Sequence, residues 1–93
     1  MLFIVNWTAL PSVNRSAAER FLQTGGAPPE GIKMIGRWHG IGSIRGFAVC
    51  ETDDIEAMAR WAHEWADIFS MDVLPAVTDE QAGKMLMEFA QRQ

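Results

Sequence analysis

The sequence has a single cysteine, Cys50, so an intramolecular disulfide is excluded. One thiol beside six methionines fits a reducing compartment, and we expect a cytoplasmic location. Long hydrophobic runs are missing too, because the apolar segment at the N-terminus is interrupted at Asn6, far short of the ~20 residues of a membrane helix. No basic segment precedes this run and no small-residue cleavage site follows it, so we expect neither a membrane partner nor a signal peptide.

Basic residues are also few. Eight Lys and Arg stand against twelve Asp and Glu, which gives a formal net charge of −4. Nucleic-acid-binding proteins usually carry a basic surface, so we expect no nucleic-acid partner. The two histidines and the cysteine show none of the spacings that hold metals, and no glycine-rich phosphate loop is recognisable. We therefore expect no bound metal and no cofactor.

The 93 residues suit one domain with a modest core, and 48% of them are hydrophobic. Hydrophobic periodicity predicts strands at 2–8, 32–39, 43–51 and 68–77, with helices at 12–24, from 52 or 53 to 66, and from 78 onward. Two successive strand–helix–strand units are the signature of a ferredoxin-like α+β sheet, with helices on one face. We predict a single ferredoxin-like βαββαβ domain over residues 1–93, extended by a C-terminal helix. That helix is expected to pack on its own domain, with a reach across a dimer as the alternative.

Alternation along the second and third strands assigns their side chains to two faces of the sheet. If the hairpin turns at Ile41, Arg37 lies opposite Arg45, and both share a face with His39. This face mixes large apolar groups with charges and is expected to be the open one. The other face, which carries Trp38, is apolar and is expected to lie beneath the helices. An open face that is half apolar favours association with a second copy of the chain.

The runs LFIVNW, KMIGRWHG and GFAVCETDD resemble a small uncharacterised bacterial family of the dimeric α+β barrel superfamily. The resemblance covers nearly the whole chain, and its most specific part is GRWHG at residues 36–40. It implies a homodimer whose two sheets pack through their open faces into a barrel. It implies no particular reaction. The wider superfamily includes cofactor-free monooxygenases, isomerases and haem-degrading enzymes, but this sequence lacks the third-strand tryptophan of the haem-degrading branch.

Two arginines are the strongest candidates for a ligand site. The guanidinium groups of Arg37 and Arg45 could together clamp a carboxylate or phosphate. Alternatively, Glu51 or Asp72 neutralises them within an interface. His39, at the end of its strand, could serve as a general base, or could simply bond to a loop carbonyl.

Asn6, Trp61 and Cys50 are the other residues with a candidate role in a site or in the core. Asn6 interrupts an apolar strand, and its amide needs a partner: a ligand, a water molecule or a polar neighbour such as Ser70. Trp61 lies at the flank of the apolar stripe of the second helix, where with Trp65 it could cover a pocket mouth or belong to the core. Cys50 is expected in the helix-side core as an inert thiol.

These residues support three hypotheses. The preferred one is a homodimeric barrel that binds a small, partly apolar, anionic ligand in a cavity on the open sheet face. Its ligand-binding residues would be Arg37, His39, Arg45, Asn6 and Trp61. The second is a cofactor-free enzyme of the monooxygenase or isomerase type with His39 and Asn6 as catalytic residues. The third is a purely structural dimer with a filled interface.

Overall fold

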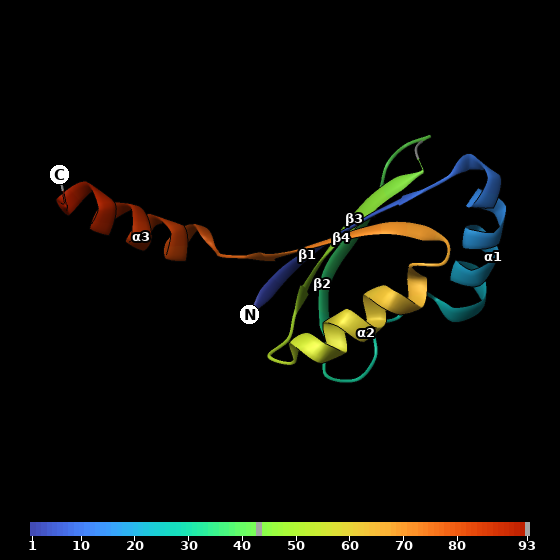
Figure 1. The fold of residues 1–93 in the computed structure, drawn as a ribbon, viewed down its shortest axis with the longest axis horizontal. Helices are drawn as coiled ribbons and strands as arrows, with labels where there is room; N and C mark the ends of the chain where they lie inside the picture. The colour runs from blue at the N-terminus through green and yellow to red at the C-terminus, as the bar shows by residue number, and fades with distance from the viewer. Residues whose placement is uncertain (43, 93) are drawn as a thin grey trace.

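The computed structural model describes residues 1–42 and 44–92, and its elements follow the predicted βαββαβα order (Figure 1). Within this part of the chain, four antiparallel strands form one sheet in the order β2-β3-β1-β4, which confirms the ferredoxin-like α+β fold. The predicted start of the third strand at residue 43 lies outside the described residues. The elements are β1 (Leu2–Ala9), a 3-10 turn (Pro11–Val13), α1 (Asn14–Thr24), β2 (Lys33–His39), β3 (Arg45–Glu51), α2 (Ile55–Trp65), β4 (Phe69–Ala76) and α3 (Asp79–Gln91).

Local sequence signals set the helix ends close to their predicted positions. α1 ends at Gly25, whose φ of 71° is left-handed and favours glycine. α2 begins one residue later than expected, because the Asp54 side chain accepts a hydrogen bond from the Ala57 amide at 3.1 Å. The buried Thr52 hydroxyl instead fixes the loop, since it donates to the Gly31 carbonyl at 2.8 Å.

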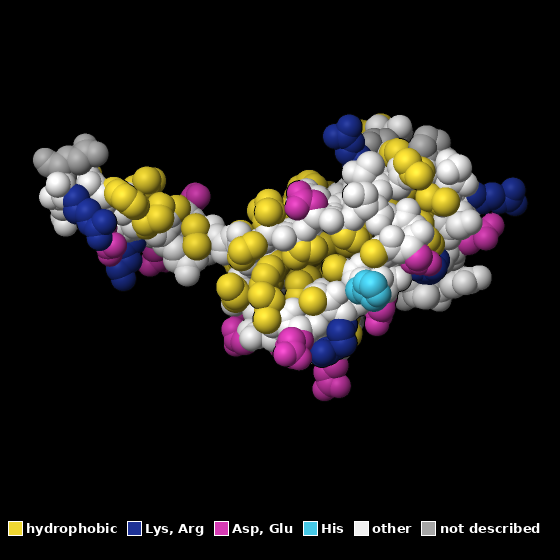
Figure 2. Space-filling view, viewed as in Figure 1, with side chains coloured by type: hydrophobic (Ala, Val, Ile, Leu, Met, Phe, Trp, Pro, Cys, Tyr) yellow, Lys and Arg dark blue, Asp and Glu magenta, His cyan; other side chains and the backbone are white. Residues whose placement is uncertain are grey.

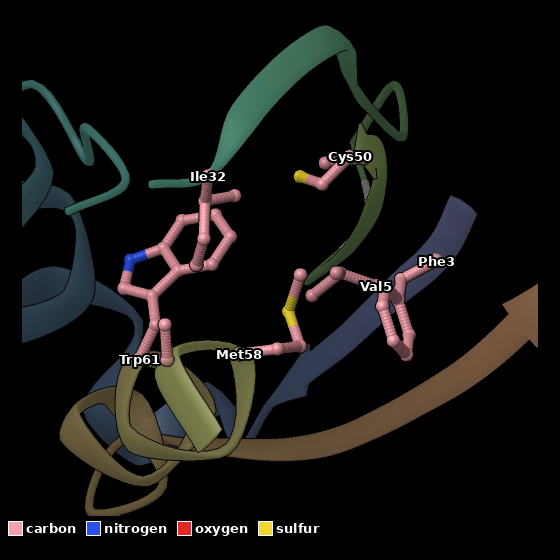
Figure 3. Close-up of a cluster of buried hydrophobic side chains, with 8 residues drawn as sticks. Phe3, Val5, Ile32, Cys50, Met58 and Trp61 are labelled. Atoms are coloured by element: carbon pink, nitrogen blue, oxygen red, sulfur yellow. The ribbon is translucent and has the colours of Figure 1, made fainter. Parts of the chain in front are cut away.

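The core lies between one face of the sheet and α2 (Figure 3). Alternate residues of β1 point into it, while Asn6 shares the opposite, open face with its neighbours on β4. β4 is an edge strand, the position in a sheet where a proline such as Pro75 is tolerated. The most buried side chains of this core are Phe3, Val5, Ala48, Cys50, Met58 and Trp61.

α2 is rotated relative to the predicted stripe. Ala57, Met58 and Trp61 are its buried residues, whereas Ile55 remains 62% exposed. Trp61 was expected at the flank, but it lies in the core, where burying an indole removes a large apolar surface from water.

α3 does not pack on its own domain, and the expectation that it would is wrong. It extends beyond the sheet on the side of the N-terminus, away from α1 and α2 (Figure 1). None of its described residues is buried, and the described chain measures 52 Å along its longest axis. The apolar spacing of this helix was predicted correctly, but the surface it covers was not.

Candidate functional site

A β-bulge in β2 determines which side chains reach the helix-covered face. The pairing of β2 with β3 shifts by one residue between Met34 and Gly36. Because side chains alternate along a strand, one inserted residue moves every later side chain to the other face. Arg37 therefore pairs with the fully buried Ala48 and lies beneath the helices. The predicted placement of Arg37 on the open face is wrong for this reason. Its predicted pairing with Arg45 is wrong because the register of β2 against β3 differs from the expected one already before the bulge, where Met34 pairs with Cys50.

The same bulge exchanges the faces of His39 and Trp38. The His39 ring lies on the helix side, with its centroid 5.8 Å from that of Trp7 and 5.4 Å from that of Phe21. Trp38 lies on the open face, where it stacks on Phe47 at 5.2 Å and stays 51% exposed. The sequence had placed each of these two residues on the opposite side.

Two glycines make room for tryptophan rings on the two faces. A Cβ atom at Gly36 would collide with the indole of Trp38, and one at Gly46 would collide with the indole of Trp7. Both glycines are needed for close approach rather than for an unusual φ, since neither has a positive φ.

A cavity of about 440 Å³ lies between the helix-covered face of the sheet and helices α1 and α2. Small-molecule sites typically measure ~300–1,000 Å³, so the volume suits one small ligand. No acidic side chain is found among the described residues that line it, and its charged or titratable groups are Arg37, Arg45 and His39. The aromatic part of the wall is formed by Trp7, Phe21, Trp61, Trp65 and Phe69.

Trp61 presents an unsatisfied donor at this cavity. Its side chain is 7% exposed, and no described protein group accepts a hydrogen bond from its buried Nε1. Figure 3 shows the nitrogen edge of the indole pointing away from Met58 and Val5, toward α1. Buried polar groups nearly always have a partner, so this nitrogen has a hydrogen available for a water molecule or for an acceptor atom of a ligand.

Arg37 is partly committed to the fold. Its Nη1 donates to the Gly26 carbonyl at 2.7 Å, and its Nη2 donates to the Gly25 carbonyl at 3.0 Å. Its guanidinium carbon also lies 4.7 Å from the centroid of the Phe21 ring. Each terminal nitrogen keeps a second hydrogen, so Arg37 can anchor α1 and still donate into the cavity.

The other two predicted ligand-binding residues are Arg45, at the edge of this cavity, and Asn6, outside it. Arg45 lines both this cavity and a hollow of about 620 Å³ on the open face. Asn6 lines only the open-face hollow, where its Nδ2 donates to the Asp72 carbonyl at 3.4 Å rather than to Ser70. The structure thus brings Arg37, His39 and Trp61 together on the helix side, with Arg45 at the border. Asn6 is absent from that cavity and shares only the open-face hollow with His39 and Arg45.

An ion pair beside the cavity was missed from the sequence. Arg20 of α1 donates to both carboxylate oxygens of Asp67, at 2.9 and 2.7 Å, and to the Glu64 carbonyl at 3.2 Å. Its guanidinium carbon lies 5.2 Å from the centroid of Trp65, which stacks on Phe69. The hydrogen bond from Arg20 lowers the pKa of Asp67. These contacts connect α1 with the end of α2, next to the part of the aromatic wall formed by Trp65 and Phe69.

Cys50 is fully buried, and burial raises the pKa of its thiol while the charge of Arg37 lowers it. This matches the expected inert core position. Across residues 1–42 and 44–92, no group of three side chains is arranged to hold a metal ion. None of the described helices is long and apolar enough to cross a membrane.

The fold and the site define a ferredoxin-like α+β domain with an aromatic-lined cavity. The chain belongs to the family described as Domain of unknown function (DUF3303), whose model matches residues 1–90, so the expected uncharacterised family is confirmed. No curated protein matches the sequence. One similar solved structure is a mutant of MhuD with two manganese protoporphyrin IX bound per active site. It is 16% identical with a TM-score of 0.44, over 85% of this chain and 97% of that chain.

Proposed function

We propose that this protein binds a small, partly apolar, anionic ligand in the cavity between the sheet and helices α1 and α2. The observation that carries this proposal is the buried, unpartnered Nε1 of Trp61 beside an aromatic wall. A buried donor without a partner costs ~1–3 kcal/mol, and an acceptor oxygen of a ligand would remove that cost. The site lies beneath the helices, not on the open face where the sequence placed it.

The charges around the cavity favour an anion. The Arg37 guanidinium lines it with hydrogens left to donate, and guanidinium groups bind carboxylates and phosphates well. The aromatic wall favours a flat apolar body on the same ligand. His39 lies between Trp7 and Phe21, where it could add a hydrogen bond to the ligand.

Catalysis without a cofactor is the alternative. It retains His39, which borders the cavity, but the Asn6 amide points to the open face and bonds to Asp72. The two candidate catalytic residues share only the open-face hollow and not the helix-side cavity, so binding in that cavity is better supported than turnover there. A purely structural dimer is the remaining alternative, and it requires the cavity to bind nothing.

We also propose that two copies of the chain associate through their open sheet faces and that the protein is cytoplasmic. Trp38 and Phe47 support the first point, because they form a stacked, half-exposed pair on that face. The single buried Cys50 supports the second.

Fluorescence titration with anilinonaphthalene sulfonate, an aromatic anion, tests the binding proposal. Trp61→Phe removes the N–H and keeps an aromatic ring, so the dissociation constant should rise about three- to tenfold, as expected for one lost hydrogen bond. Trp38→Phe makes the same chemical change on the open face and should leave the constant unaltered. Equal effects of the two substitutions, or wild-type protein that binds no dye, would contradict the proposal.

A further inference from the structure

α3 carries an apolar stripe that no described part of the chain covers. Met85, Leu86 and Phe89 lie on one side of the helix and are 46%, 60% and 54% exposed. Figure 2 shows hydrophobic side chains along one side of α3 and charged ones along the other. A 13-residue helix is marginal by itself in water. This stripe therefore needs a surface to pack against.

The open face of the sheet is the second uncovered apolar surface. Trp38 and Phe47 are 51% and 43% exposed there, and Leu74 on β4 is 48% exposed. Leu74 pairs with Ile4, whose neighbour Asn6 marks the same face. The chain thus has one apolar helix and one apolar sheet face, each without a cover among the described residues.

We propose that α3 is an exchanged arm, which lies across the open sheet face of a second copy of this chain while the second copy's α3 covers the first. This rests on the proposed association of two copies through their open sheet faces, and it places the two α3 helices between those faces instead of a direct contact of sheet with sheet. The dimensions agree: 13 residues of helix span about 20 Å. Four strands at about 4.8 Å spacing form a surface of similar width.

The exposed area also suits a second copy. A large apolar side chain has roughly 200 Å² to bury, so the half-exposed stripe of one α3 offers on the order of 300 Å². Two exchanged arms and the two faces that receive them would bury about 1,300 Å² in total, within the range of standard stable interfaces. A two-fold arrangement covers all four surfaces at once and closes, so it does not lead to open-ended assembly.

The connection to α3 disfavours packing on its own sheet. Thr78 has an extended backbone, with φ −75° and ψ 167°, and forms a capping box with Gln81 that starts the helix at once. No turn therefore redirects the chain between β4 and α3, and the helix continues outward (Figure 1). The arm is directed toward a neighbour rather than back to its own domain.

Size-exclusion chromatography with light scattering on the full chain tests this arm exchange. Wild-type protein should have twice the chain mass of 10.4 kDa. Leu86→Asp on the stripe and Leu74→Asp on the receiving face should each reduce the mass to one chain. Met87→Asp is the matched control. It introduces the same charge at the adjacent position in the sequence, which faces the opposite side of α3, and it should leave the dimer intact. Cooperative urea unfolding checks that each variant is folded. If Leu86→Asp does not unfold cooperatively, Leu86→Ser replaces it with the same expectation.

Wild-type protein of one chain mass would overturn the proposal, since α3 would then be uncovered or packed on its own domain. A Leu86→Asp dimer would overturn it too, even if Leu74→Asp dissociated, because the sheets would then pair directly. Dissociation by Met87→Asp, or a dimer that survives Leu74→Asp, would likewise contradict it. The ligand proposal is tested independently of the arm exchange. Its dye titration reports on Trp61, on the helix-covered face, and uses protein in which α3 is unchanged.

Discussion

The guanidinium carbon of Arg37 lies 4.7 Å from the centroid of the Phe21 ring, so a side chain of β2 holds the end of α1. The same group donates to the carbonyls of Gly25 and Gly26, where α1 ends. The C-terminus of a helix carries partial negative charge, and a cation stabilises it. One arginine thus connects the position of α1 with the charge of the cavity.

Arg37→Met should lower the free energy of unfolding by about 1–3 kcal/mol, because two hydrogen bonds from a charged donor are lost. Arg37→Lys keeps the charge but not the planar fork, so its loss should be smaller but measurable. Urea unfolding followed by circular dichroism measures both. Lys33→Met, on an exposed residue of the same strand, should change the value by less than about 0.5 kcal/mol. An equal loss in Lys33→Met would contradict the assigned role of Arg37.

Gly46→Ala should destabilise the fold by about 1–3 kcal/mol, since the added methyl group collides with the Trp7 indole in a packed interior. Gly83→Ala is the matched control, because a Cβ atom there meets nothing within 4 Å. That substitution should raise the helix content of α3, as Ala favours a helix by ~1 kcal/mol over Gly. Thermal and urea unfolding measure the first effect, and far-UV circular dichroism measures the second. A stable Gly46→Ala variant would show that Trp7 has room to move.

The order of elements was predictable because each strand and helix has its own periodicity and clear ends. The β1 faces were ambiguous in the sequence, because both alternating sets of residues are largely apolar, and Asn6 was the one polar signal. The β2 faces were assigned wrongly, because a simple hairpin and a bulged one differ by one residue, and both give alternating patterns. Gly36 was the available signal, since an isolated glycine within a strand often marks a bulge.

Contacts between residues far apart in the chain could not be predicted from the sequence. Arg20 and Asp67 are 47 residues apart, and their pairing depends on how α1 and α2 come together on the sheet. The position of Trp61 likewise depends on the rotation of α2, which is decided by packing against the whole sheet rather than by the spacing within the helix. The amphipathic pattern of α3 gave its apolar face but not the surface that it contacts.

The Arg20–Asp67 pair should make stability depend on pH at the acidic end. The pKa of Asp67 is lowered from its ordinary value of 3.8, so its contribution is complete above that value and is lost as the pH falls through the lower folded value. Asp67→Asn should remove this part of the acid dependence while reducing stability at neutral pH. Urea unfolding from neutral pH to below 3.8 measures it. Glu30→Gln, at an exposed acid without a described ion pair, should retain the wild-type slope. A wild-type slope in Asp67→Asn would contradict the assignment.

The most direct test of the ligand site follows the indole N–H groups of the four tryptophans by two-dimensional NMR during titration with anilinonaphthalene sulfonate. Tryptophan-to-phenylalanine variants assign each signal. If an anion bound beneath the helices accepts the Trp61 hydrogen, the Trp61 signal should move with saturation and that of Trp38 should not. A Trp38 signal that moves while the Trp61 signal stays fixed would place binding on the open face and contradict the proposed site.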